Sequence, residues 1–415
     1  MSHRGRALGF LLLVAAGWMG IQRATATQGR GPNYQVDPWW PRPFQDQSWV
    51  LGSITGVTVD AQNHVWVVHR GGDSLEANEK GLMLTPPSAG LCCKAAPFVL
   101  EFDQKGVLVS NWGGPGQGYA WPQSPGSLAV DAKGNVWIAA AGLEPPPATP
   151  ARGRGDAVVG EAPAPTPGRG RGGPPPGPAD AHVLKFSRDG KFLLQIGTPG
   201  KMDGPDSQTT LNRPAAVAYD SAANEVFVAD TGHRRIVVFD ADKGIYKRHW
   251  FAYGEKAAGA APAVYAPNDP PAKSFRDVTC VEIARDGQVY VCDRSSNRIQ
   301  VFRKDGTFVR EGIVSKNTLG ATVTGQFGVV SSHGSAWDLA FSNDAQQRYV
   351  LVANGHDKKV HVLQRDTLAQ VGSFGSGGRY PGQFLAVGSI AVDAQGNVYT
   401  GEQHHGKRVQ KFAQR

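Results

Sequence analysis

Apolar and polar residues alternate in short stretches along most of the chain, and the clearest example spans Val278–Glu311. Its alternating stretches are separated by two turns, Asp286-Gly287 and Asp305-Gly306, and by a polar loop at 294–297. Alternation with a period of two, broken by Asp-Gly turns, is typical of β-hairpins. The segment therefore predicts four short antiparallel strands.

This four-strand unit recurs six times along the chain. The first strand of each unit begins near Gly56, Ser127, Ala216, Cys280, Asp338 and Ser389. The third strand of each unit begins near Val99, Val183, Ile236, Ile299, Val360 and Val409. A repeated four-stranded antiparallel unit is typical of a β-propeller. We therefore expect an all-β fold, a six-bladed β-propeller over residues 49–415.

The sixth unit reaches Arg415 without a fourth strand, whereas Trp49–Gly52 fits the fourth-strand pattern just before the first unit. We expect this N-terminal strand to pair with the last blade and close the ring, because closure removes an unpaired strand edge. Residues 27–48 show no repeat pattern and are expected to form an extended lead-in to the propeller.

The N-terminus has the pattern of a signal peptide over residues 1–26. Arg4 and Arg6 precede an apolar stretch at 7–21, and Ala24-Thr25-Ala26 forms a cleavage site of the A-x-A type. The pattern predicts secretion, to a periplasm or outside the cell, and no membrane span after cleavage. An uncleaved membrane anchor is the alternative reading of the same apolar stretch.

Charge and composition agree with an exported propeller. The chain of 415 residues has 53 glycines, 19% charged residues and a formal charge of +8. Removal of residues 1–26 takes away three arginines and leaves 40 basic against 35 acidic side chains, a formal charge of +5. This balance is too mild to predict a nucleic-acid partner.

Two insertions separate the second and third strands of the first two units, at Gly71–Pro97 and Leu143–Asp180. The second insertion is dominated by proline and glycine and lacks apolar mass, so we expect a disordered loop at 143–180. Its Arg-Gly repeats and the tripeptide Arg154-Gly155-Asp156 are interpreted as products of this composition and not as recognition motifs.

Four cysteines fall into two pairs, and export permits disulfides. Counting back from the turn at 285–287 places Cys280 opposite Cys292, so the two predict a cross-strand disulfide or two buried free thiols. Cys92 and Cys93 are adjacent, which leaves a vicinal disulfide, two unpaired thiols, or a link to another chain. No cysteine spacing matches a structural zinc site.

In a propeller, the loops between the second and third strands gather at one end of the central channel, and here most of these loops are polar. The candidate ligand-binding residues are His69, Arg70, Asp73, His233, Arg294, His356 and His404. Arg70 and His233 are also the candidate catalytic residues. Acidic or amide strand ends and the arginines before the third strands recur between units, so we expect those residues to brace the loops.

The repeat resembles NHL repeats over nearly all of Trp49–Phe412, which implies a propeller without deciding its function. NHL-type propellers include protein binders, RNA binders and enzymes. Among the enzymes, the chain is similar to the peptidyl-α-hydroxyglycine α-amidating lyases. The shared motifs are V-V-H-R-G at Val67–Gly71, F-V-A-D at Phe227–Asp230 and C-D-R-x-x-N-R-I-Q-V-F at Cys292–Phe302.

This resemblance implies a catalytic role for Arg70 and a zinc ion held by three histidines. The corresponding positions here are Gly126, Thr279 and Gly388, and none of them is a ligand. The family's catalytic tyrosine falls in the loop after Asp230, where this chain has no tyrosine. We therefore expect no zinc at the family's positions.

Two classes of function follow. The first is a secreted propeller that binds a small-molecule, peptide or protein ligand at one end of its channel. The alternative is an enzyme with a rebuilt site, either a carbon-oxygen lyase resembling peptidylamidoglycolate lyase or a calcium-dependent, lactonase-like hydrolase. Calcium therefore stays open as a cofactor, since Asp277, Glu282 and Asp338 lie near the predicted axis. The enzyme reading requires that His69, Arg70 and His233 meet.

Overall fold

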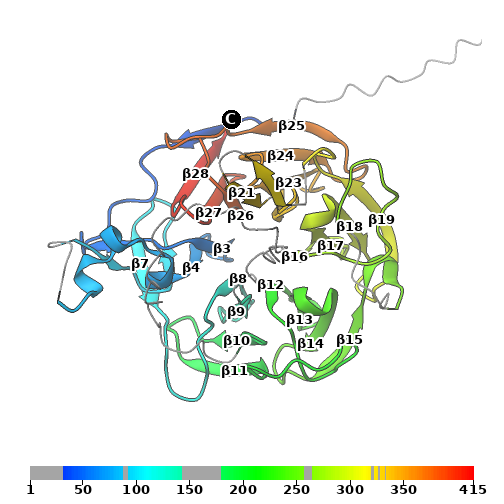
Figure 1. Ribbon diagram of the computed structural model, residues 1–415, viewed down its shortest axis with the longest axis horizontal. Helices are drawn as coiled ribbons and strands as arrows, with labels where there is room; N and C mark the ends of the chain where they lie inside the picture. Colours follow the sequence, from blue (N-terminus) through cyan, green and yellow to red (C-terminus); the bar gives the residue numbers. More distant parts are fainter. Residues whose placement is uncertain are drawn as a thin grey trace, which may run out of the picture. The chain divides into compact units, whose positions relative to one another are not determined.

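The computed structural model describes residues 31–86, 92–142, 179–256, 264–318, 322–325, 328–331 and 333–415. This part of the chain contains six four-stranded antiparallel sheets, which are the six predicted blades (Figure 1). Blade 1, from the innermost strand outward, is β3 (Ile54–Val59), β4 (Val65–His69), β6 (Val99–Phe102) and β7 (Leu108–Trp112). Blade 2 is β8 (Pro125–Val130), β9 (Val136–Ala140), β10 (His182–Phe186) and β11 (Phe192–Gly197).

The next two blades carry the clearest repeats. Blade 3 is β12 (Pro214–Asp220), β13 (Glu225–Asp230), β14 (Arg235–Asp240) and β15 (Tyr246–Trp250). Blade 4 is β16 (Val278–Ile283), β17 (Val289–Asp293), β18 (Arg298–Phe302) and β19 (Phe308–Ile313). The strand bounds follow the alternation in the sequence to within two residues.

The last two blades bring the chain back to the first. Blade 5 is β22 (Asp338–Phe341), β23 (Tyr349–Asn354), β24 (Lys359–Gln364) and β25 (Gln370–Phe374). Blade 6 is β26 (Val387–Val392), β27 (Val398–Glu402), β28 (Val409–Gln414) and β1 (Tyr34–Asp37).

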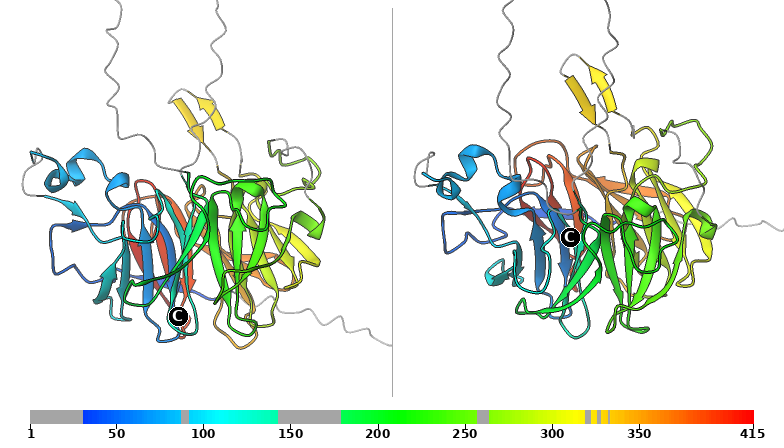
Figure 2. Two further views of the ribbon diagram at one scale, coloured as in Figure 1. Left: turned by 90° about the horizontal axis from the view of Figure 1, so that it is seen from below. Right: turned by 60° about the horizontal axis from the view of Figure 1, so that its bottom comes forward.

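The innermost strands of the six blades surround one axis. Each contacts the innermost strand of the next blade, and β26 contacts β3, so the ring within Gly31–Arg415 is closed (Figure 1). Figure 2 shows the blades edge-on, with the strands running between the two ends of the ring. The core lies between neighbouring blades, as in the cluster that joins Phe227 and Val238 of blade 3 to Val281 and Val291 of blade 4.

The repeat motif has a packing reason. An aromatic residue of the second strand is fully buried in most blades, as at Trp66, Trp137 and Tyr290, because each second strand lies within its sheet and between two other blades. The aspartate that ends the first strand closes the following turn. In blade 1 the Oδ1 of Asp60 accepts the backbone N–H groups of Gln62 and His64 at 2.9 and 2.8 Å.

The ring is closed by an N-terminal strand, as predicted, but the strand is β1 and not Trp49–Gly52. β1 pairs antiparallel with β28, with Val36 opposite Phe412. The short strand β2 (Trp49–Val50) instead pairs parallel with β5 (Lys94–Ala95) of the first insertion. The closing strand thus lies within residues 27–48, which we had expected to form only an extended lead-in. Trp40, in the same segment, is buried 4.9 Å from Tyr399 by ring centroid.

Six short 3-10 helices are the only helices among the described residues. They are η1 (Gly71–Ser74), η2 (Ala77–Glu79), η3 (Gly81–Met83), η4 (Thr231–His233), η5 (Ala252–Gly254) and η6 (Arg294–Ser296). A further hairpin, β20 (Thr322–Gly325) with β21 (Gly328–Ser331), stands beyond one end of the ring (Figure 2). No helix in the described ranges is long and apolar enough to cross a membrane.

Two predictions lie outside the described residues. These are the signal peptide at 1–26 and almost all of the low-complexity insertion, of which only residues 179 and 180 are described.

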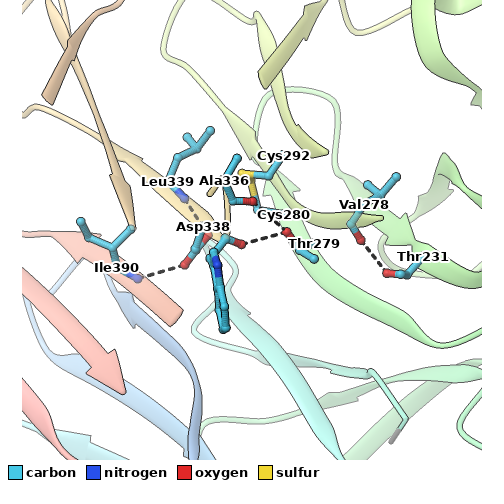
Figure 3. The surroundings of a disulfide bond; sticks show 10 residues. Thr231, Val278, Thr279, Cys280, Cys292, Ala336, Asp338, Leu339 and Ile390 are labelled. Carbon is cyan, nitrogen blue, oxygen red and sulfur yellow. Dashed lines mark hydrogen bonds between the residues drawn. A yellow bond between two sulfur atoms is a disulfide. The ribbon is translucent and has the colours of Figure 1, made fainter. Parts of the chain in front are cut away.

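Both cysteine pairs lie at disulfide distance. Cys280 and Cys292 are opposite each other in the register of β16 and β17 and are joined across the strands, as the turn predicted (Figure 3). Both are buried. Cys92 and Cys93 form the vicinal pair. The pair lies beside η3, where Leu82 donates its N–H to the carbonyl of Cys93 at 3.1 Å.

Candidate functional site

One end of the central channel holds a small cavity of about 90 Å³, which we call the axial cavity. Every blade contributes to it the residue at the start of its innermost strand. These six positions are Thr55, Gly126, Ala215, Thr279, Trp337 and Gly388. Five blades add the residue that follows the second strand, at Arg70, Ala141, Thr231, Arg294 and Gln403. The loops between second and third strands therefore meet at this end, as expected.

The charged residues of the axial cavity are mostly basic. Three arginines, Arg70, Arg213 and Arg294, line it together with two carboxyl groups, Asp277 and Asp338. Since guanidinium groups stay protonated, their charge does not depend on pH in the ordinary range. The cavity is thus suited to an anion.

Arg294 is held rigidly. Its Nε and Nη2 lie 2.8 and 2.7 Å from Oδ2 of Asp277, which neutralises one positive charge. The guanidinium also lies over the indole of Trp337, 4.9 Å from the ring centroid. Trp337 is fixed in turn by the bond from its Nε1–H to the carbonyl of Gly334 at 2.8 Å. The indole forms one wall of the cavity and carries the arginine on its face.

Asp338 lies at the inner boundary of the axial cavity and also lines a second cavity of about 200 Å³ further along the channel. Its carboxylate accepts the N–H groups of Leu339 and Ile390, each at 2.9 Å, and so joins blade 5 to blade 6 (Figure 3). Burial raises the pKa of Asp338 to about 7 despite these bonds. Glu282 lines the second cavity, and burial with the nearby charge of Asp338 raises its pKa well above the usual value.

His69 does not line the axial cavity and is completely buried. Its Nδ1 accepts the N–H groups of Gly52 and Gly71 at 3.1 and 3.0 Å, and its Nε2–H donates to the carbonyl of Pro97 at 2.8 Å. Burial lowers the pKa of His69 to about 4, so the ring is neutral. Both nitrogens are used within the loop, which makes His69 a brace and leaves no atom for the predicted ligand.

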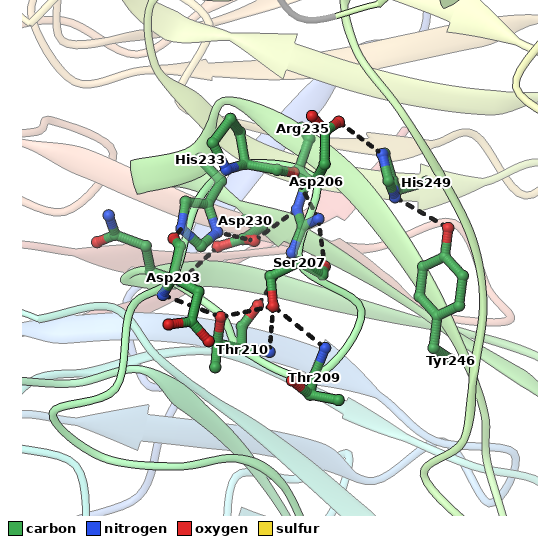
Figure 4. Close-up of polar contacts among 12 residues, drawn as sticks. Asp203, Asp206, Ser207, Thr209, Thr210, Asp230, His233, Arg235, Tyr246 and His249 are labelled. Atoms are coloured by element: carbon green, nitrogen blue, oxygen red, sulfur yellow. Dashed lines mark hydrogen bonds and ion pairs between the residues drawn. The ribbon is translucent and has the colours of Figure 1, made fainter.

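His233 also lies away from the axial cavity. Its Nδ1 and Nε2 lie 2.8 and 2.6 Å from Oδ2 of Asp230 and the carbonyl of Asp203, so both nitrogens face acceptors (Figure 4). Asp230 is bound as well by the Nε of Arg235 at 2.8 Å. The residue we predicted as catalytic is therefore part of a buried bracing network, and it does not meet Arg70.

The recurring acids and arginines brace the loops as expected. Arg298 pairs with Asp293 at 2.9 Å, and Arg408 pairs with Glu402. In each case the arginine also donates to backbone carbonyls of the loop that leads into the same blade. Recurrence in the sequence thus indicates structure here, as the comparison of units suggested.

The other candidates are spread over the rim. His404 is exposed near the mouth of the axial cavity, where its ring stacks on His333 at 6.3 Å and lies edge-on to Trp337 at 6.2 Å. Asp73 is exposed on η1, one turn beyond Arg70, and does not line the cavity. His356 lines a separate surface hollow with Lys316.

The zinc site of the amidating lyases does not fit this cavity. The three corresponding positions, Gly126, Thr279 and Gly388, line it, and none offers an imidazole. A Cβ atom on Gly126 would lie only 2.4 Å from the carbonyl oxygen of Ala215, so the neighbouring blade leaves no room for a side chain there. The hydroxyl of Thr279 is used by the carbonyls of Ala336 and Trp337 (Figure 3).

A second group of potential metal ligands is formed by Asp60 and His64, in the turn between β3 and β4, with Glu101 of β6. Arg188 pairs with both carboxylates, at 3.0 Å from Oδ2 of Asp60 and in direct contact with Glu101. The guanidinium supplies the positive charge that a metal would supply, so this group needs no ion.

The described residues form a six-bladed β-propeller with a mostly basic cavity on its axis. Residues 211–239 and 275–302 match the family model described as NHL repeat. These segments cover β12 to β14 and β16 to β18, the blades with the clearest turns.

Two curated proteins show sequence similarity to this chain. Peptidylglycine alpha-amidating monooxygenase of Rattus norvegicus is 23% identical over 286 residues, which cover 66% of this chain and 24% of that protein. NHL repeat-containing protein 3 of Homo sapiens is 34% identical over 133 residues, which cover 30% of this chain and 31% of that protein. The chain therefore spans less than a third of either relative, and the similarity to the first agrees with the motifs shared with amidating enzymes.

Solved propeller structures cover most of the chain at low identity. A streptogramin B lyase superposes with a TM-score of 0.47 and 12% identity, covering 92% of this chain and 98% of that one. A virginiamycin B lyase from Staphylococcus aureus gives a TM-score of 0.43 and 10% identity, covering 92% and 88%. Nothing about activity follows from likenesses of this size.

Arg213 is the lining residue that sequence reasoning missed. It lies in the loop before β12, where no pattern repeats between units. A signal was present, because aligning the six innermost strands places Arg213 two positions before the axial residue Ala215, level with Asp277 in blade 4.

Proposed function

We propose that this propeller binds a small anion, or the anionic end of a peptide or protein partner, in the axial cavity. The observation that carries the proposal is the convergence of three arginines on one cavity with two carboxyl groups, Asp277, which pairs with Arg294, and Asp338. A guanidinium presents several N–H donors in one plane and matches the oxygens of carboxylate, phosphate and sulfate groups. Arg70 is the proposed anchor and Arg294 the rigid second contact.

The lyase alternative gains less support. Neither His69 nor His233 lines the axial cavity with Arg70, and the ring nitrogens of both are engaged in bracing contacts, so they do not support the predicted acid–base group. The donor set at Gly126, Thr279 and Gly388 does not fit zinc. Binding therefore explains the cavity with fewer assumptions than catalysis does.

The test is a titration of the purified mature protein with sodium acetate and sodium sulfate at constant ionic strength, followed by thermal unfolding or calorimetry. We expect saturable binding of at least one anion, and loss of that binding in Arg70→Gln. Arg303→Gln removes one exposed arginine outside the cavity and is the control for net charge. Equal affinities in wild type, Arg70→Gln and Arg303→Gln, or no saturable binding of either anion, would overturn the proposal.

We also propose that the protein is exported. The two cysteine pairs at disulfide distance support this, because disulfides persist in oxidising compartments and are rare in the cytosol. Fractionation of the native host, with detection of the mature N-terminus, tests it. Recovery of the full-length chain from the cytosol alone would contradict export.

A further inference from the structure

The guanidinium of Arg213 differs from that of Arg294 in its contacts with the described residues. Arg294 is paired with Asp277 and stacked on Trp337, whereas the guanidinium of Arg213 makes no hydrogen bond or ion pair within the described ranges. Arg213 lines the axial cavity and is only partly exposed. A charged group held at a cavity wall without a counter-charge is costly unless a ligand or water satisfies it.

The position of Arg213 is fixed by its backbone and by its aliphatic stem. Its N–H donates to the carbonyl of Asp180 at 3.1 Å, and its φ of 50° places it in the left-handed region. A Cβ atom on Gly142 would lie 3.0 Å from Cγ of Arg213, so the stem packs directly against a glycine. Asp180 holds this corner together by accepting the N–H groups of Ser124 and Gly142 at 2.9 and 3.1 Å.

The formal charge of the residues that line the axial cavity sets the charge of the ligand that the cavity favours. The three arginines and Asp277 give the residues that line the cavity a formal charge of +2, and ionisation of Asp338 lowers it to +1. Burial holds the pKa of Asp338 near 7, so it removes only part of a charge at neutral pH. Below pH 7, where Asp338 is mostly protonated, a bound monoanion leaves the cavity with excess positive charge and a dianion balances it.

We propose that Arg213 is a specificity-determining residue that makes the axial cavity selective for small dianions over monoanions. The inference rests on the proposed anion-binding function and deepens it. The ligand class is a group or short molecule with two negative charges within a few ångströms, such as a sulfate, a phosphate monoester end or a short dicarboxylate. In a partly buried site, Coulomb attraction makes the second negative charge contribute more to the binding free energy than it would in water.

This proposal also agrees with the absence of histidines at the positions that correspond to the family's zinc ligands. At the axial positions that correspond to the family's histidines the chain has no imidazole, and three guanidinium groups lie in the same cavity. Positive charge is thus supplied by side chains. Arginine binds anions through directed N–H groups, so the cavity selects by charge and by the placement of oxygens.

The experiment compares dissociation constants of sulfate, succinate and acetate for the wild type, Arg213→Gln, Arg213→Lys and Arg70→Gln, at about pH 6.5, where Asp338 is mostly protonated, and at constant ionic strength. We expect sulfate or succinate to bind at least about tenfold more tightly than acetate, as one added charge-assisted hydrogen-bonded contact provides. Arg213→Gln should weaken the dianions about tenfold and change the affinity for acetate by less than about threefold. Arg213→Lys should keep most of the preference, because it keeps the charge.

The outcomes separate the two proposals. If no anion binds, or Arg70→Gln has no effect, the anion-binding function itself is wrong. In a further outcome, anions bind through Arg70 while Arg213→Gln lowers the affinity for dianions and for acetate by the same factor, or changes neither affinity. Either result would show that the role assigned to Arg213 is wrong. Sulfate binding without succinate binding identifies a tetrahedral oxyanion, and the reverse identifies a dicarboxylate. Thermal unfolding of Arg213→Gln and Arg213→Lys shows that each variant is folded before its affinity is compared.

Discussion

The Nε of Arg298 lies 2.9 Å from Oδ2 of Asp293, and no more than 1% of either side chain is exposed. The same pair recurs as Arg235 with Asp230 at 2.8 Å. We expect Asp293→Ala to lower the free energy of unfolding by about 3 kcal/mol, because it removes the buried partner of Arg298 and leaves only the longer contact of its Nη1 with Glu311, at 3.3 Å. Denaturant unfolding measures the change.

Asp366→Ala is the matched control, since Asp366 is exposed and makes no hydrogen bond or ion pair among the described residues. Its effect should stay within about 0.5 kcal/mol. A loss below about 1 kcal/mol for Asp293→Ala would show that the recurring pair does not brace the loop.

We expect the free energy of unfolding to fall as the pH is lowered, because His69 titrates. The folded pKa of His69 is about 4 and its ordinary value is 6.5, so the unfolded chain binds the proton more readily, and stability is lost as pH falls through this window. Between pH 7 and pH 5 this one group should cost about 2 kcal/mol of unfolding free energy.

His69→Asn keeps a hydrogen-bond acceptor but has no titrating ring. We therefore expect it to remove the part of the pH dependence of the unfolding free energy that is due to His69. Unfolding free energies of both proteins at the two pH values give the comparison. Equal slopes would mean that His69 is not the buried neutral ring described here. Asp338 titrates in the opposite sense in both proteins and cancels in the difference.

The cross-strand disulfide should contribute directly to stability. Cys280 and Cys292 enclose a short loop, and a closed loop of this size contributes about 3 kcal/mol by restricting the unfolded chain. We expect the double variant Cys280→Ala/Cys292→Ala to lose about that amount under non-reducing conditions. Alkylation of the unreduced, denatured wild type should modify neither residue, and mass spectrometry that finds both alkylated would contradict the pairing.

Zinc should be well below one ion per chain. The three axial positions that correspond to the zinc histidines carry no imidazole, and Gly126 is enclosed by the backbone of the next blade. Elemental analysis of the mature protein, purified without chelator and with zinc in the growth medium, tests this. Stoichiometric zinc would require a different set of ligands and would return the lyase reading to consideration.

The sequence predicts the blades well for two reasons. A strand packed between two blades needs apolar residues at alternate positions or along its whole length, and each turn between strands needs an aspartate or a glycine. The register of Cys280 opposite Cys292 follows from the same turn geometry. The closing strand was misassigned because Trp49–Gly52 and Tyr34–Asp37 are both short extended stretches. Which of them pairs with β28 depends on contacts more than 350 residues away, which a local pattern does not contain.

The site is predicted in part. Arg70 and Arg294 follow second strands, so the repeat itself places them on the axial cavity. His69 ends a second strand, at the position that Asp230 and Asp293 occupy in other blades, and its bracing role could have been inferred from that equivalence. Arg213 belongs to no repeated motif, and its place on the cavity emerges only when the six innermost strands are aligned and it falls level with Asp277.

The pairing of Val36 with Phe412 has a consequence for the order in which the molecule is completed. On the ribosome the strand Tyr34–Asp37 is made first of all those in the ring, and its partner is made last. The early strand therefore waits through the synthesis of every other blade, and the closing contact carries the largest loop-closure entropy in the chain. Blades 1 to 5 can form as their residues emerge, whereas the sixth remains a three-stranded sheet until both ends are present, so a stalled or truncated chain would present an open edge to other molecules.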